Sequence, residues 1–171
     1  MSPPELTPLD PEPILATLRK HEVRFVVIGA IAAILQGYPL PTYDLDITPD
    51  DAPDNLERLA DALRELEAKL RTPQGAIDFP VDAKMLSGAR VWTLTTRAGD
   101  LDLVFDPAGT AGYADLRRGA IAYDIGSGEI PVASLIDVIR SKETAHRVKD
   151  QAQLPALRRT LELRRERESR S

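Results

Sequence analysis

Apolar residues along the first half of the chain switch repeatedly between helical and strand periodicity. Residues 14–20 carry apolar side chains on one helical face, whereas residues 23–28 are β-branched and aromatic, which favours a strand. Gly29 ends that strand, and the small apolar residues after it predict a second helix. Residues 44–47 alternate as a short strand does, and the leucine spacing over residues 54–70 predicts an amphipathic helix.

The second half of the chain predicts shorter elements in a different order. The expected strands are residues 90–96, 101–105, 120–125 and 129–132, and the expected helices are residues 81–87, 134–142 and 155–167. Residues 97–100 join two of these strands in a hairpin-like connection, and residues 72–75 are expected to form a turn. This order predicts an α/β (α+β) protein, with a small mixed β-sheet flanked by helices and a helical C-terminal part.

The chain divides into three expected segments. Residues 1–12 are rich in proline and predict a flexible arm, residues 13–155 form the main domain, and residues 156–171 form a basic C-terminal helix or tail. No apolar run approaches the roughly 18–20 residues that a membrane span needs, and the first residues lack the pattern of a signal peptide. The sequence therefore predicts a cytoplasmic protein that does not contact a membrane.

Composition restricts the chemistry that the chain can perform. It has no cysteine and 2 histidines, which excludes disulfides, thiol nucleophiles and zinc sites built from several cysteines or histidines. The formal net charge of −5 argues against a uniformly basic surface, although a local basic patch is compatible with it. Any metal site must therefore be built from carboxylates.

Aspartates on predicted strands are the main candidates for such a site. Asp44 and Asp46 are two residues apart and share one face of a strand, where their repulsion raises one pKa unless a cation such as Mg²⁺ or Mn²⁺ lies between them. The alternative is a solvent-facing polar side of an edge strand. Asp102 is a lone carboxylate within an apolar strand, so it is either exposed or paired with a positive group. If its strand lies beside that of Asp44, three carboxylates converge as a metal site for a triphosphate requires.

A glycine turn is a second candidate. Gly29 ends a strand and begins a helix, where free backbone N–H groups can bind a phosphate. Most turns of this kind bind nothing, so the turn is a weak signal by itself. Its position shortly before the Asp44–Asp46 pair gives it more weight.

Taken together, these pieces resemble the nucleotidyltransferase superfamily of the polymerase-beta type, in which a strand ending in glycine precedes an Asp-x-Asp pair and a later lone Asp. The residues that carry this resemblance are Gly29, Asp44, Asp46 and Asp102. Residues 37–46 and 142–150 also resemble the G-x-x-R-x-T-x-D-x-D and K-x-x-x-x-R-x-K-D segments of the AbiEii/MenT branch, which includes toxins of toxin–antitoxin systems. The resemblance covers about residues 23–155, and the second segment matches at every defining position.

The resemblance implies a small mixed sheet of nucleotidyltransferase type and a role for each matched residue. Asp44 and Asp46 would bind the metal ion and the triphosphate, and Asp102 would complete the metal site and activate the acceptor hydroxyl. Lys142 would act as a catalytic residue in contact with the phosphates. The other residues implied in nucleotide or phosphate binding are Gly29, Ala30, Thr42, Arg147, Lys149 and Asp150.

Two positions depart from the family pattern. Ala30 stands where the family usually has serine or glycine, which removes a hydroxyl contact to phosphate. Leu40 stands where an arginine is usual, which removes a contact to phosphate or substrate. These changes are compatible with altered substrate choice, weak activity or an inactive relative, whereas the intact carboxylates favour an active enzyme.

The function predicted from the sequence is a nucleotidyltransferase that uses Mg²⁺ or Mn²⁺ to transfer NMP from an NTP to an acceptor hydroxyl. The resemblance implies a tRNA 3′ end as acceptor, a toxin role and a cognate antitoxin as partner. One rival hypothesis keeps this chemistry with a protein or small-molecule hydroxyl as acceptor. The second rival is a catalytically inactive relative that binds nucleotide. The arginines between residues 158 and 170 form either a phosphate-binding strip for RNA or a solvated helix face.

Overall fold

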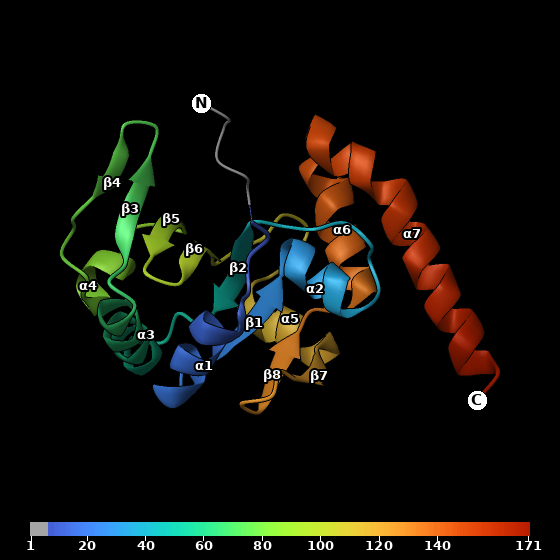
Figure 1. Cartoon of the computed structure of the whole chain (residues 1–171), viewed down its shortest axis with the longest axis horizontal. Coiled ribbons are helices and arrows are strands. Elements are labelled where there is room, and N and C mark those ends of the chain that lie inside the picture. Colours follow the sequence, from blue (N-terminus) through green and yellow to red (C-terminus); the bar gives the residue numbers. More distant parts are fainter. Residues whose placement is uncertain (1–6) are drawn as a thin grey trace.

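The computed structural model describes residues 7–171 (Figure 1). Its strands are β1 (Phe25–Ile28), β2 (Asp44–Pro49), β3 (Lys69–Thr72), β4 (Gly75–Ile77), β5 (Val91–Thr96), β6 (Gly99–Val104), β7 (Ile121–Asp124) and β8 (Glu129–Val132). Its helices are α1 (Glu12–Lys20), α2 (Gly29–Leu35), α3 (Pro53–Glu65), α4 (Ala83–Leu86), α5 (Tyr113–Gly119), α6 (Leu135–Ala145) and α7 (Val148–Ser169).

The strands form one mixed sheet in the order β4-β3-β5-β6-β2-β1-β8-β7. Figure 1 shows the β3–β4 hairpin at one end of the molecule and α7 at the other, with helices against the sheet between them. The predicted fold class, a mixed sheet flanked by helices with a helical C-terminal part, is confirmed.

The central strands bring distant parts of the sequence side by side. β2 runs parallel to β6 with Asp46 opposite Asp102, and antiparallel to β1 with Asp46 opposite Ile28. β5 runs antiparallel to β6 with Thr93 opposite Asp102. Because residues that lie opposite one another on neighbouring strands share a face, these four residues form a row across one side of the sheet.

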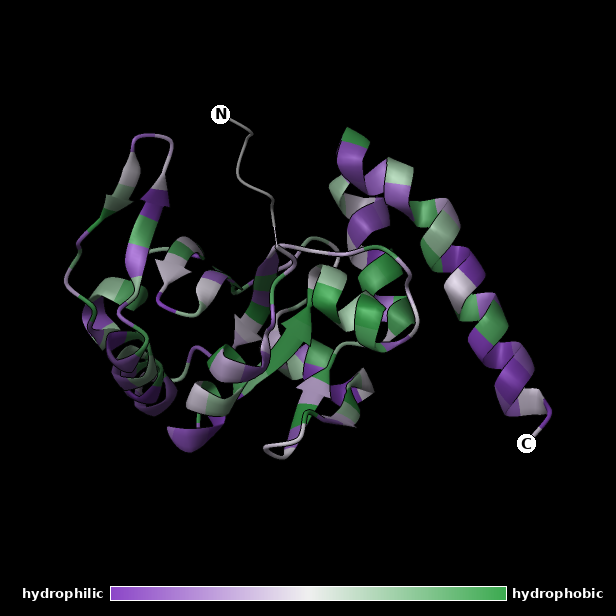
Figure 2. Ribbon diagram, viewed as in Figure 1, coloured by the Kyte–Doolittle hydropathy of each residue, from purple (hydrophilic) through white to green (hydrophobic). Residues whose placement is uncertain are grey.

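The residues that alternate with this row build the hydrophobic core. Leu45, Leu101 and Leu103 point away from the row and are completely buried. They belong to one core cluster together with Ile14 of α1 and Leu59 of α3. Figure 2 shows β1 as a hydrophobic strand at the centre of this core. The aspartates are therefore held by strands whose other face is firmly packed.

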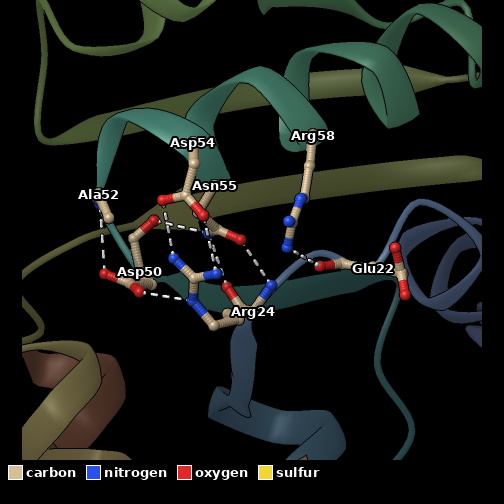
Figure 3. Close-up of polar contacts among 7 residues, drawn as sticks. All are labelled: Glu22, Arg24, Asp50, Ala52, Asp54, Asn55 and Arg58. Carbon is tan, nitrogen blue, oxygen red and sulfur yellow. Dashed lines mark hydrogen bonds and ion pairs between the residues drawn. The ribbon is translucent and has the colours of Figure 1, made fainter.

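A network of polar contacts joins the start of β1 to the region where β2 leads into α3 (Figure 3). The Arg24 guanidinium binds Asp50 at 2.8 Å and Asp54 at 3.1 Å. The fully buried Asn55 side chain accepts a hydrogen bond from the Arg24 N–H at 2.7 Å and donates one to the Asp50 carbonyl at 2.7 Å. These contacts fix the end of β2, and with it the register of the strand that carries Asp44.

The helix expected over residues 54–70 is shorter than predicted. α3 ends at Glu65, because Glu67 takes a left-handed conformation with φ 53° and the Ala68 N–H bonds back to Leu63. The chain then forms the β3–β4 hairpin, where the sequence predicted the end of a helix and a turn. The short helix α5 is also absent from the prediction.

The last helix begins earlier than expected. α7 starts at Val148 instead of near residue 155, and Pro155 lies inside it. His146 ends α6 with φ 54°, and the extended Arg147 then leads directly into α7, which packs against α6. Residues 142–150 therefore form a corner between two helices.

The expected N-terminal arm is described only in part, since residues 1–6 lie outside the described residues. Residues 7–11 form no helix or strand, and the Leu9 N–H donates to the Thr42 carbonyl at 3.0 Å. The division into arm, main domain and tail stays a prediction. Within residues 7–171, no helix has both the length and the apolar character needed to cross a bilayer.

Candidate active site

Three aspartates converge where β2 and β6 lie side by side. Asp44, Asp46 and Asp102 each present a carboxylate oxygen, and these three oxygens lie within 4.8 Å of one another. The parallel pairing of the two strands creates this arrangement, because it sets Asp46 opposite Asp102 and Asp44 one pleat away on the same face. The oxygen atoms are close enough for one cation to contact all three.

The electrostatics of the cluster favour a cation. Burial, followed by the charges of Asp44 and Asp102, raises the pKa of Asp46 to about 7, while Lys142 acts in the opposite direction. Burial also raises the pKa of Asp102, although Arg71 opposes this shift. A divalent ion would relieve the repulsion that these shifts reflect. An all-oxygen donor set is the one that Mg²⁺ and Mn²⁺ prefer, so the residues present are suited to such an ion.

Gly29 lies directly against this cluster. It begins α2 with φ +66°, and a Cβ atom at this position would overlap the Asp46 carboxylate. Both the backbone conformation and the close approach therefore require glycine. Ala30 follows in the first turn of α2 and is half-buried.

Replacing Gly29 with alanine is expected to displace Asp46 and to weaken Mn²⁺ binding at least tenfold. Calorimetric titration of the purified protein with Mn²⁺ measures this change. Gly126→Ala is the matched control, because Gly126 also has positive φ (94°) but a Cβ there would meet nothing within 4 Å. Equal Mn²⁺ affinities of the two variants would contradict a role of Gly29 in shaping the candidate metal site.

A positively charged corner faces the aspartates. Asp150 is only 1% exposed, and it accepts hydrogen bonds from Lys142 at 3.3 Å and from Arg147 at 2.8 Å. Burial raises the pKa of Asp150, but the hydrogen bond from Arg147 and the charge of Lys142 outweigh that effect and lower it. Asp150 thus holds two cationic side chains in place. Lys149 is exposed on the first turn of α7.

One cavity of about 440 Å³ contains most of these groups. The charged residues that line it are Asp46, Asp102, Asp137, Lys142, Arg147 and Asp150, and Gly29 lines it as well. Apolar residues such as Val104, Leu116 and Val138 line the remainder. A lining that combines charged and apolar residues suits a ligand that combines phosphates with a less polar group.

Four predicted site residues are not among the residues that line this cavity, namely Asp44, Ala30, Thr42 and Lys149. The Thr42 hydroxyl donates to the Asp44 carboxylate at 3.1 Å, so its visible role is to orient Asp44. Leu40, the position that departs from the family pattern, is 53% exposed and leaves no cation there.

Arg71 is a residue at this site that the sequence did not predict. It lies on β3 and donates to Asp102 at 2.7 Å. Asp102 was expected to need either exposure or a positive partner, but the sequence predicted no strand at residue 71. No local pattern pointed to Arg71, because its position depends on the pairing of β3 with β5.

Comparison with known proteins supports an assignment of the fold. The sequence matches no family model and no curated protein. The structure is similar to a protein of Thermotoga maritima assigned as a nucleotidyltransferase, with TM-score 0.56, 19% identity and coverage of 84% of this chain and 87% of that chain.

Two further solved structures are similar over most of the chain. The lincosamide antibiotic adenylyltransferase LnuA, with lincomycin bound, has TM-score 0.59 and 13% identity, with coverage of 89% of this chain and 98% of LnuA. An antigenic nucleotidyltransferase-like protein of Paracoccidioides brasiliensis has TM-score 0.52 and 15% identity, with coverage of 92% of this chain and 79% of that chain. With its mixed sheet and flanking helices, this chain therefore has a nucleotidyltransferase-like fold.

Proposed function

We propose that this protein is a metal-dependent nucleotidyltransferase that transfers NMP from an NTP to an acceptor hydroxyl and releases pyrophosphate. The observation that carries the proposal is the convergence of Asp44, Asp46 and Asp102 beside Gly29 and the Lys142 corner. The shared fold adds support, since LnuA is an adenylyltransferase.

The proposed roles follow from where each group lies. Asp44, Asp46 and Asp102 would hold Mg²⁺ or Mn²⁺, which supplies positive charge that neutralises and orients the triphosphate. Lys142 and Arg147 line the same cavity and would bind phosphate oxygens, over which negative charge spreads as transfer proceeds.

The transfer itself exchanges the phosphoanhydride bond between the α- and β-phosphates for a phosphoester bond to the acceptor. The acceptor oxygen bonds to the α-phosphorus, the bond from that phosphorus to the bridging oxygen breaks, and pyrophosphate leaves. Asp102 would take the proton of the acceptor hydroxyl. Burial raises the pKa of this carboxyl, which makes it a better proton acceptor.

The remaining residues are proposed to position these groups. Gly29 and the Ala30 backbone let the triphosphate approach Asp46, and Thr42 orients Asp44 through its hydroxyl. Asp150 holds Lys142 and Arg147. Lys149, exposed beside them, extends the positive charge outward.

For the acceptor we propose a tRNA 3′ end, with a toxin role of the AbiEii/MenT type and a cognate antitoxin. The match of residues 142–150 to the late segment of that branch supports this proposal. A second candidate is a small-molecule hydroxyl, which the structural similarity to the lincomycin-bound LnuA favours. A protein hydroxyl would be a third acceptor, and an inactive relative would bind nucleotide without transferring it. The cytoplasmic location stays a prediction.

A transfer assay separates these candidates. The protein is incubated with each α-labelled NTP, Mg²⁺ or Mn²⁺, and in turn total tRNA, a protein extract or a panel of antibiotics with free hydroxyls. Label in tRNA supports the first proposal, whereas label in a protein or an antibiotic replaces the acceptor. NTP binding without any transfer would contradict the enzymatic assignment. Asp78→Asn, a change at an 89% exposed side chain, is the control that should keep full activity.

A further inference from the structure

Three contacts fix the guanidinium of Arg71. It donates to Asp102 Oδ1 at 2.7 Å and to the Leu94 carbonyl at 2.7 Å, and it lies 3.3 Å from Asp100 Oδ2. The bond to the Leu94 carbonyl is independent of any charged group. The orientation of the guanidinium is therefore set by the backbone of β5 as well as by the carboxylates.

The ion pair between Arg71 and Asp102 is partly shielded from water. The Arg71 side chain is 29% exposed and that of Asp102 is 20% exposed. A charge pair in such surroundings is screened less than a pair on the open surface. The positive charge of Arg71 therefore acts on Asp102, the member of the aspartate cluster that it contacts.

The strand register places Arg71 at the end of the row of site residues. Leu70 lies opposite Leu94, so the next position on β3 comes beside Thr93, which itself lies opposite Asp102. Arg71 is not among the residues that line the 440 Å³ cavity in the described part of the chain. Its contact with the aspartate cluster is made through Asp102, so its effect on the reaction passes through that carboxylate.

A carboxylate has two oxygens, and Arg71 occupies one of them. The bond from the guanidinium to Oδ1 of Asp102 fixes the orientation of the carboxylate, and Oδ2 has no hydrogen bond to Arg71. The guanidinium also offsets part of the negative charge that would attract a cation. Orienting Asp102 favours turnover, whereas compensating its charge weakens metal binding. The two effects of Arg71 on the reaction are therefore opposed.

We propose that Arg71 is a positioning residue that orients Asp102 for the transfer and lowers the metal affinity of the aspartate cluster. This inference rests on the proposed function for its kinetic part alone. Its metal-binding part can be measured without any turnover.

The test compares Arg71→Met with the wild-type protein. Calorimetric titration with Mn²⁺ should show at least fivefold tighter binding to the variant than to the wild-type protein. The kcat for NMP transfer should fall at least 30-fold, while the KM for NTP stays within threefold. Damage that is merely structural would weaken Mn²⁺ binding, so tighter binding together with slower turnover identifies the proposed role.

Two further variants make the result decisive. Arg71→Lys keeps the charge but not the fork of donors, so its Mn²⁺ affinity should lie near that of wild type while kcat remains reduced. Arg90→Met is the matched control, because Arg90 also binds two carboxylates, Asp51 and Asp106, and neither belongs to the aspartate cluster. The Arg90→Met variant should keep the Mn²⁺ affinity and the kcat of the wild-type protein.

Several outcomes would overturn the proposal. Unchanged or weaker Mn²⁺ binding in Arg71→Met excludes the effect on metal affinity, and an unchanged kcat excludes the positioning of Asp102. If the wild-type protein transfers no nucleotide to any acceptor, the proposed function fails, while the Mn²⁺ titration still decides the role of Arg71.

Discussion

Asp46→Asn should abolish NMP transfer and yet stabilise the metal-free protein at pH 8. The pKa of Asp46 is raised to about 7 by burial and by its two aspartate neighbours. In the unfolded chain the pKa of the same group is about 3.9. Its charge therefore destabilises the fold increasingly as the pH rises from about 4 to about 7, and the effect is constant above that range.

An asparagine keeps the shape of the side chain and removes this charge. The free energy of unfolding at pH 8, measured with urea in the presence of a chelator, should rise by about 1–3 kcal/mol. At pH 4 the variant and the wild type should have nearly equal stability. The transfer rate should fall about 1,000-fold or more, since a proposed ligand of the metal is lost.

Added Mg²⁺ should narrow the difference in stability at pH 8, because it binds the wild-type site and stabilises the folded state by mass action. Asp78→Asn serves as the control and should change neither quantity. A variant at position 46 that retains a tenth of wild-type transfer would show that the reaction takes place elsewhere. If Asp46→Asn and the wild-type protein are equally stable at pH 8, the charge of Asp46 does not destabilise the fold.

Asp150→Ala should have the largest effect on stability. It removes a carboxylate that is 1% exposed and leaves Lys142, itself 16% exposed, without its partner. Breaking a buried ion pair on one side costs about 3–5 kcal/mol. Urea denaturation at pH 7 measures the loss, and transfer should fall at least tenfold because Lys142 and Arg147 are no longer held.

The dependence of this loss on pH follows from the lowered pKa of Asp150. A carboxyl with a lowered pKa stabilises the fold above its unfolded value of about 3.9, and this contribution disappears as the pH falls through the folded value. The difference between variant and wild type should therefore shrink as the pH falls below about 4.

Glu143→Ala is the matched control for the corner between α6 and α7. It removes an exposed ion pair with Arg158, 2.7 Å long, that joins the same two helices. Exposed pairs contribute about 0–1 kcal/mol, so this variant should remain close to wild type. If both variants lose similar stability, burial is not what makes Asp150 important.

The part of the fold that could be predicted is the part in which local pattern and tertiary structure agree. Residues 44–47 and 101–105 alternate clearly, and both occur as strands with apolar residues in the core and aspartates on the other face. The β3–β4 hairpin could not be predicted, because Leu66 and Leu70 continue the helical spacing of α3. The chain leaves that helix at Glu67, which has a left-handed backbone conformation. Glutamate seldom adopts this conformation, and no residue nearby in the sequence predicts it.

The candidate site divides in the same way. Parity along a strand put Asp44 and Asp46 on one face, and chemistry required a positive partner for Asp102 if it was buried. The identity of that partner depended on the pairing of β3 with β5, which no local pattern encodes. The motif over residues 142–150 includes Asp150, but the burial of this side chain arises from the corner between two helices.

The strand order determines how much of the chain must be synthesised before the cavity can form. Asp46 pairs with Asp102 and Val27 with Val132, so the central strands are joined by contacts between segments far apart in the chain. Such non-local contacts are expected to form slowly, because loop-closure entropy is lost before the contacts are made. A nascent chain on the ribosome cannot complete the cavity before residues 142–150 have emerged. Under the proposed function, a partly synthesised chain would be unable to transfer nucleotides.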